Sequence, residues 1–146
     1  VKPVIERIIS AYRLLPRPTQ SSGSLAFKVS VRPEHAVFPG SLQDLQDLYG
    51  TLLENAMRFA EHVIHTSVTS SSDNGAVDWI LVVEDDGSGF SEEQLSDFVG
   101  ASEQALASSD GFGLGLGIVR EIVRHYNGQI IFDRSALGGA RIKISL

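Results

Sequence analysis

The sequence contains no cysteine, one methionine and one tryptophan among its 146 residues. Without cysteine the chain cannot form a disulfide framework, which is compatible with the cytosol. No apolar run reaches the length of about eighteen residues that a membrane-spanning helix requires, and no signal peptide begins the chain. We therefore expect the fragment itself to be soluble and cytoplasmic, although a membrane-bound sensor could precede it.

Charged residues make up only 21% of the chain, and the net charge is −6. A negative balance argues against nucleic acid or an anionic membrane as the main partner. The hydrophobic content of 42% suffices for one core at a length typical of single domains. The chain begins at Val1 rather than Met, so we interpret residues 1–146 as one domain of a longer protein.

Two common phosphate-binding motifs are also missing. A P-loop requires Gly-Lys, and that pair occurs nowhere in the chain. A dinucleotide fingerprint requires GxGxxG, but counting from Gly111, Gly113 or Gly115 the sixth residue is Leu116, Ile118 or Arg120. Any phosphate site in this chain is therefore of a different type.

An acidic, glycine-containing turn follows a strongly apolar segment. Trp79–Val83 has the composition of a buried strand, and it leads into Glu84-Asp85-Asp86-Gly87-Ser88-Gly89-Phe90. The two glycines permit positive φ and close approach of a ligand. The pattern predicts that the strand delivers carboxylates to a binding site.

A second glycine-rich segment, Gly111-Phe112-Gly113-Leu114-Gly115-Leu116-Gly117, leads directly into apolar residues at helical spacing, Ile118–Val123. A glycine-rich loop before a helix offers free backbone N–H groups and the positive end of the helix dipole to phosphate. Together the two segments indicate a nucleotide site.

A helix is predicted from about Ser41 to His62, because apolar residues recur there at spacings of three and four. Its other stripe is polar and aromatic: Thr51, Asn55, Arg58, Phe59 and His62. These side chains project on neighbouring sides of the helix. Phe59 could equally belong to the core, and Arg58 could be a solvated surface charge.

The remaining elements follow from shorter patterns. We predict a first helix over Val4–Leu15, a strand over Leu25–Val31, and a hairpin loop over Ser67–Gly75 before a strand at Val77–Glu84. A closing hairpin is expected from Gly128–Phe132 and Gly138–Ile144.

In this order, Leu-Leu-x-Asn-Ala-x-Arg-Phe, Asp-x-Gly-x-Gly and Gly-x-Gly-Leu-Gly-Leu-Gly resemble the N, G1 and G2 boxes of the catalytic ATP-binding domain of sensor histidine kinases. The likeness extends over roughly the whole chain. It implies the ATP-binding fold of the gyrase, mismatch-repair and histidine-kinase type. That fold is an α/β two-layer sandwich with a mixed, mainly antiparallel sheet, helices on one face and a mobile ATP lid, here Phe90–Asp110.

The resemblance also implies roles for the residues of the N box. Asn55 would coordinate Mg²⁺, which bridges the triphosphate, and Arg58 stands where the family has a basic residue near phosphate. Phe59 would stack near adenine. Thr51 occupies the first N-box position, where many relatives have Asn and the hydrolysing ones Glu. A hydroxyl is a poor base at neutral pH, so Thr51 would activate water weakly.

For the G boxes, the resemblance implies that Asp85 accepts a hydrogen bond from the adenine amino group. Gly87 and Gly89 would let the backbone pass under the base. The second glycine segment would form the hinge and phosphate cradle, with the contacts made by Gly111, Gly113, Leu114, Gly115 and Leu116. The preceding residues 105–110 lack the Arg or Lys often found near the γ-phosphate, so phosphate affinity is expected to be modest.

The function implied is that of a sensor histidine kinase catalytic domain. It would bind Mg-ATP and donate the γ-phosphoryl group to a histidine on a separate dimerisation and phosphoacceptor domain, with a response regulator downstream. No histidine of this chain has the acceptor's sequence context. Two alternatives remain: an ATPase domain of the gyrase or mismatch-repair type, which the absence of Glu at Thr51 disfavours, and a degenerate docking module, which intact Asn55 and Asp85 disfavour.

Overall fold

Five strands pair into one sheet in the order β1-β2-β3-β5-β4. The computed structural model describes residues 1–15, 24–73, 76–100 and 113–146. Only β1 and β2 run parallel, and every other neighbouring pair is antiparallel. The predicted mixed, mainly antiparallel sheet is therefore confirmed. The strands are β1 Ala26–Arg32, β2 Val63–Asp73, β3 Ala76–Asp85, β4 Gln129–Arg134 and β5 Ala140–Ser145.

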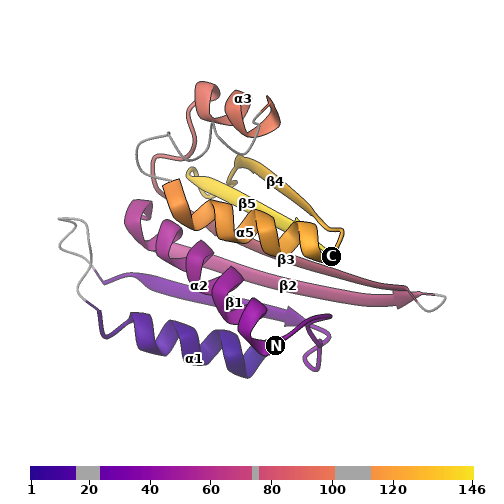
Figure 1. Cartoon of the computed structure of the whole chain (residues 1–146). Coiled ribbons are helices and arrows are strands. Elements are labelled where there is room, and N and C mark those ends of the chain that lie inside the picture. Colours follow the sequence, from indigo (N-terminus) through magenta and orange to yellow (C-terminus); the bar gives the residue numbers. More distant parts are fainter. Residues whose placement is uncertain (16–23, 74–75, 101–112) are drawn as a thin grey trace.

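Three helices lie on one face of this sheet, with α2 between the other two (Figure 1). They are α1 Lys2–Tyr12, α2 Leu42–Phe59 and α5 Gly113–His125. A shorter helix, α3 Glu92–Gly100, contacts β4. This arrangement confirms the predicted two-layer sandwich. Within the described ranges, no helix has the length and apolarity needed to cross a bilayer.

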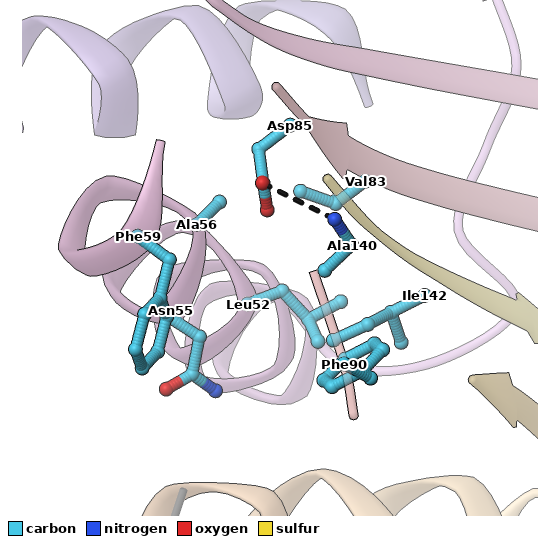
Figure 2. A pocket seen from close by; sticks show the side chains of 9 residues that line it. All are labelled: Leu52, Asn55, Ala56, Phe59, Val83, Asp85, Phe90, Ala140 and Ile142. Carbon is cyan, nitrogen blue, oxygen red and sulfur yellow. Dashed lines mark hydrogen bonds between the residues drawn. The ribbon is translucent and has the colours of Figure 1, made fainter. Parts of the chain in front are cut away.

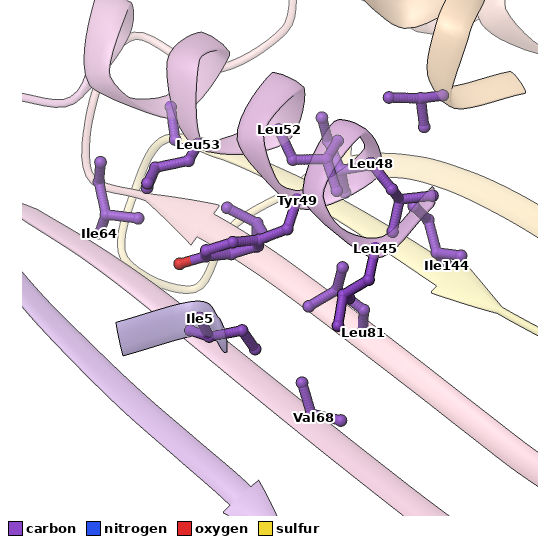
Figure 3. Close-up of a cluster of buried hydrophobic side chains, with 14 of the residues drawn as sticks. Ile5, Leu45, Leu48, Tyr49, Leu52, Leu53, Ile64, Val68, Leu81 and Ile144 are labelled. Carbon is purple, nitrogen blue, oxygen red and sulfur yellow. The ribbon is translucent and has the colours of Figure 1, made fainter. Parts of the chain in front are cut away.

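The core lies between α2 and the sheet, where leucines of the helix meet apolar residues of the central strands (Figure 3). Leu48 and Leu52 are fully buried, as are Leu81 and Ile144 on the strands. One buried polar pair crosses the layer: the Tyr49 hydroxyl lies 3.0 Å from Thr66 Oγ1. Burial raises the pKa of Tyr49 to about 12, with the Thr66 contact opposing it. The pair is thus neutral at physiological pH and tolerates the apolar surroundings.

Helix α2 begins where the sequence predicted and ends three residues earlier. Ser41 caps its N-terminus, because the Ser41 Oγ accepts a hydrogen bond of 3.0 Å from the Asp44 N–H. Its last residue is Phe59, because Ala60 adopts an extended ψ of 138°. The chain then turns through Glu61 and His62 into β2, so the predicted extension to His62 is wrong.

The hairpin loop predicted over Ser67–Gly75 is also wrong in its bounds. Ser67–Asp73 continues β2 and pairs antiparallel with Ala76–Val82 of β3. Serine and threonine suit this strand because alternate residues face opposite sides of the sheet. Val68 is fully buried, whereas Thr69 is exposed.

Helices α2 and α5, which carry the N-box and G2 segments, are joined near both ends. At one end the Tyr126 hydroxyl donates a hydrogen bond to Asp44 Oδ2 and accepts one from the Ser41 N–H. At the other, a Cβ on Gly115 would lie only 2.9 Å from the Thr51 methyl carbon. The two helices therefore pack closely where the predicted site residues lie.

Candidate functional site

Side chains from the end of α2, the end of β3 and the start of β5 line one pocket (Figure 2). The cavity that these side chains leave open is small, about 10 Å³. Three of the predicted site residues, Asn55, Phe59 and Asp85, meet here. The complete lining is Leu52, Asn55, Ala56, Phe59, Val83, Asp85, Phe90, Ala140 and Ile142. The pocket is thus mainly apolar, with one amide and one carboxylate.

Asp85 is the last residue of β3, and its carboxylate is only 3% exposed. Its Oδ1 accepts hydrogen bonds from the N–H groups of Gly87, at 2.9 Å, and Ala140, at 3.2 Å. Within the described residues both bonds go to Oδ1, so Oδ2 can accept a ligand N–H. Burial raises the pKa of Asp85 above its ordinary value, while the two backbone bonds oppose that rise.

Asn55 lies on α2, on another wall of the pocket from Asp85. Its Nδ2 atom is buried and has no hydrogen-bond partner in the part of the chain that the structure describes. A buried amide without a partner is costly, typically by about 1–3 kcal/mol. Because an amide Nδ2 only donates hydrogen bonds, such an orphaned group points to a ligand that carries an acceptor, such as a phosphate oxygen.

Thr51 and Arg58 lie on the same helix but outside the pocket lining. Thr51 is half-buried one turn before Asn55, with its methyl group against Gly115 of α5. Arg58 is exposed. On α2, the residues that form the apolar wall of the pocket are therefore Leu52, Ala56 and Phe59.

The glycines of the G1 segment are required for two different reasons. Gly89 has a φ of +71°, which confirms the predicted positive φ. Gly87 is required for space, because a Cβ there would collide with the backbone carbonyl of Phe59. The close approach at Gly87 is thus to the end of α2 rather than to a ligand.

The second glycine segment is only partly described. Helix α5 already begins at Gly113, so Gly115 and Gly117 lie in its first turns rather than in a loop before Ile118. Leu116 is fully buried in the core. Gly111 lies outside the described residues, as does the predicted lid over 101–110. Ser91 precedes α3, and its Oγ accepts a hydrogen bond from the Gln94 N–H, at 3.1 Å.

The β4–β5 turn also contributes to the pocket, which the sequence motifs did not predict. Gly139 passes so close to Asp85 that a Cβ would collide with its Oδ1 and with the Gly87 nitrogen. The next residue, Ala140, donates to the same carboxylate. The Gly138-Gly139 pair was the available signal, because adjacent glycines often mark a close approach of two backbones. Phe90 was also missed; it is 3% exposed and its ring contacts Phe132 edge-on, with centroids 5.8 Å apart.

A metal at this site would have few protein ligands. Within the described ranges, no group of three or more His, Asp or Glu side chains could hold a metal ion. Mg²⁺ commonly retains waters and takes one or two protein oxygens together with phosphate oxygens. The Asn55 amide offers one oxygen to a cation, and its orphaned Nδ2 can donate to a phosphate oxygen, so the side chain fits a magnesium ion bound to a polyphosphate.

The sequence profile of the histidine kinase-, DNA gyrase B- and HSP90-like ATPases matches residues 40–146, which include all three motifs. The chain belongs to this family. The predicted resemblance to the ATP-binding domains of two-component sensor histidine kinases is therefore confirmed.

Individual members of this ATPase family support the same conclusion. The virulence sensor histidine kinase PhoQ of Salmonella typhimurium is 31% identical over 144 residues, which cover 99% of this chain and 28% of PhoQ. The chain thus spans less than a third of that relative. The mycobacterial sensor histidine kinase MprB has a TM-score of 0.67 at 24% identity, covering 99% of this chain and 92% of that structure. Full-length ShkA, solved in complex with AMPPNP, has a TM-score of 0.68 at 19% identity, with 99% and 29% covered. These two structures confirm the fold.

Proposed function

We propose that this domain binds Mg-ATP in the pocket between α2, β3 and β5 and donates the γ-phosphoryl group to a histidine on a separate dimerisation and phosphoacceptor domain. The observation that carries the proposal is the convergence of Asn55, Phe59 and Asp85 on one mainly apolar pocket. Membership of the ATPase family and the AMPPNP complex of ShkA support it.

The buried carboxylate selects the base. Asp85 Oδ1 is held by two backbone N–H groups, and Oδ2 accepts a hydrogen bond from the adenine amino group. Guanine presents an acceptor at the corresponding edge, which a carboxylate repels. A hydrogen bond to a charged group contributes about 1.5–3 kcal/mol. Phe59 and the aliphatic lining enclose the base between them.

Asn55 would hold Mg²⁺ through its amide oxygen, and the bound ion supplies charge neutralisation along the triphosphate. Arg58 adds positive charge near the phosphates. Gly115, in the first turns of α5, lies against Thr51, which supports a role for the G2 residues Gly113 and Gly115 beside the triphosphate. The full predicted G2 set is Gly111, Gly113, Leu114, Gly115 and Leu116.

Transfer then depends mainly on positioning. The bond between the γ-phosphorus and the bridging oxygen of ADP breaks as an imidazole nitrogen of the acceptor bonds to phosphorus. ADP leaves with the electron pair, and the imidazole loses its remaining N–H proton. Such a reaction needs little covalent assistance from the protein. Thr51 offers a hydroxyl where a base would stand, so water is a poor competitor for the phosphoryl group.

The decisive experiment combines this domain with a phosphoacceptor domain. Labelled Mg-ATP should bind the domain alone, and acid-labile phosphate should form only when the acceptor is added. Steady release of inorganic phosphate by the domain alone, abolished by Asn55→Ala, would instead identify a gyrase-type ATPase. Failure to bind Mg-ATP in calorimetry would identify a degenerate docking module. In the proposed setting the domain acts in the cytoplasm, attached to a sensor, and the phosphoryl group passes on to a response regulator.

A further inference from the structure

Asp86 faces away from the pocket and binds the backbone that follows α2. Its Oδ1 accepts hydrogen bonds from the N–H groups of Glu61, His62 and Val63, at 3.0, 2.9 and 3.0 Å. Its Oδ2 lies 3.1 Å from the His62 nitrogen and 3.2 Å from His62 Nδ1. The Asp86 side chain is 15% exposed, whereas that of His62 is 77% exposed. One carboxylate thus gathers three successive backbone donors.

These donors belong to the turn that ends the N-box helix. Ala60 leaves the helical conformation, and β2 begins at Val63, so the intervening N–H groups have no helical acceptor. A concave row of backbone N–H groups prefers an anion, and hydrogen bonds to a charged acceptor are about twice as strong as neutral ones. Burial alone would raise the pKa of Asp86, but the bonds from His62, Val63 and Glu61 outweigh it and lower that pKa. The group is therefore a carboxylate at neutral pH.

A second contact, made by the neighbouring residue, reinforces this attachment. Gly87 lies against the carbonyl of Phe59 so closely that no side chain fits between them. The turn after β3 is consequently held against the end of α2 both by the Asp86 carboxylate and by the Gly87 backbone. Asn55 and Phe59 lie on the last turns of α2, and Asp85 is the residue immediately before Asp86.

We propose that Asp86 is a positioning residue for the nucleotide: by fastening the end of α2 to the turn after β3, it sets the separation between Asn55 and Asp85. One ligand must reach both groups, so an error in their separation weakens its binding even when each group is intact. The inference rests on the proposed Mg-ATP function of the pocket. Asp85 keeps its own two bonds, from Gly87 and Ala140, when the Asp86 carboxylate is removed.

The test is Mg-ATP affinity, measured by calorimetry on four proteins: wild type, Asp86→Ala, Asp86→Asn and Asp78→Ala. Asp78 is an exposed carboxylate on the same strand and serves as the matched control. We expect Asp86→Ala to bind about tenfold more weakly while still folded, as judged by circular dichroism and thermal melting. Asp86→Asn keeps an oxygen for the three N–H groups and should stay within about threefold of wild type. Asp78→Ala should bind like wild type.

A double-mutant cycle with Asn55→Ala separates positioning from general stability. If Asp86 positions Asn55, then Asn55→Ala costs little additional affinity once Asp86 is alanine, and the two effects are not additive. Additive effects, or a folded Asp86→Ala domain with wild-type affinity, would overturn the inference. If Asp86→Ala does not fold, Asp86→Ser enters the same cycle under the same criteria. Absence of Mg-ATP binding by the wild type would refute the proposed function instead, and so the two failures are distinguishable.

Discussion

The two sides of the turn after β3 place adjacent aspartates in opposite electrostatic environments. On the pocket side, Asp85 is buried and its pKa is raised, so its negative charge costs folding free energy. On the back side, Asp86 binds three backbone N–H groups and its pKa is lowered, so its charge stabilises the fold. Two identical side chains one residue apart therefore have opposite effects on stability. Asp86 stabilises the fold, whereas the charge of Asp85 destabilises it and is the one that we propose binds the ligand.

The largest loss of stability is expected when a glycine that packs against Asp85 or its turn is replaced by alanine. Gly139→Ala places a Cβ against the Asp85 carboxylate, and Gly87→Ala places one against the Phe59 carbonyl. Each should lower the free energy of unfolding by about 1–3 kcal/mol, because backbone must move to relieve the overlap. Both should also weaken Mg-ATP binding. Chemical denaturation and calorimetry provide the measurements.

Gly117→Ala is the control for those two variants. No atom lies within 4 Å of a Cβ at this helical position. The change should therefore stabilise the domain by about 0.5–1 kcal/mol, as alanine does in a helix interior. If all three variants are equally stable, Gly87 and Gly139 do not need to be glycine and the backbone around Asp85 has room for a Cβ.

Removing only the charge on the pocket side should separate binding from stability. Asp85→Asn keeps an oxygen for the Gly87 and Ala140 N–H groups but loses the charge that we propose binds the adenine amino group. We expect ATP affinity to fall by about 1.5–3 kcal/mol. The melting temperature should not fall, because the uncharged amide avoids the desolvation that raises the pKa of Asp85. If Asp85→Asn lowers the melting temperature but leaves ATP affinity unchanged, Asp85 is a structural residue and not a ligand-binding one.

Lowering the pH should protonate the two carboxylates one after the other, Asp85 before Asp86. Because the folded pKa of Asp85 is raised, its carboxylate is protonated first, and ATP affinity should begin to fall above the ordinary aspartate value of about 3.9. The pKa of Asp86 is lower in the folded domain than in the unfolded chain. Asp86 therefore stabilises the domain fully at any pH above the ordinary aspartate pKa, and this stabilisation is lost as the pH falls through the pKa of the folded state. Affinity should therefore decline before the domain unfolds.

Calorimetry and thermal melts across this pH range check the order of the two losses. Asp85→Asn is the comparator, since its remaining pH dependence reports the titration of ATP itself and of other groups. If the melting temperature falls before affinity does, the two carboxylates have been assigned the wrong way round.

The smallest effect concerns the exposed partner of Asp86. The His62 ring lies 3.2 Å from Asp86 Oδ2, but the side chain is 77% exposed. Exposed pairs typically contribute about 0–1 kcal/mol. His62→Ala should thus leave ATP affinity unchanged and stability within about 0.5 kcal/mol, since the backbone N–H of His62 still binds the carboxylate. A large loss of affinity would place the imidazole in the nucleotide site and contradict the back-side assignment.

Sequence patterns predicted the architecture well where periodicity was long. Three predicted features are confirmed: the apolar stripe of α2 and its start near Ser41, the buried strand leading to Asp85, and the closing hairpin. Short-range patterns failed where pairing overrides composition. The serine-rich stretch 67–73 has the composition of a loop but is a strand, because β3 supplies its hydrogen bonds.

The pocket could be predicted only in part, for a similar reason. The motifs identified Asn55, Phe59 and Asp85, which meet as the ordered resemblance implied. They could not reveal the Gly139 backbone against Asp85 or the binding of Asp86 to the turn after α2, because both contacts join segments distant in sequence. The Asp-x-Gly-x-Gly motif singles out Asp85, but no local pattern shows which backbone groups Asp86 binds.

The hydrogen bond from Ala140 to Asp85 joins residues 55 positions apart, and Ala140 and Ile142 are the pocket's last residues to be synthesised. A ribosome-bound chain that has emerged only as far as β4 already carries the N box and the G1 turn, yet it lacks one wall of the pocket. A contact between residues so far apart requires a large loop to close before it can form. If the pocket binds ATP as proposed, nucleotide can stabilise the domain only after β5 has joined the sheet.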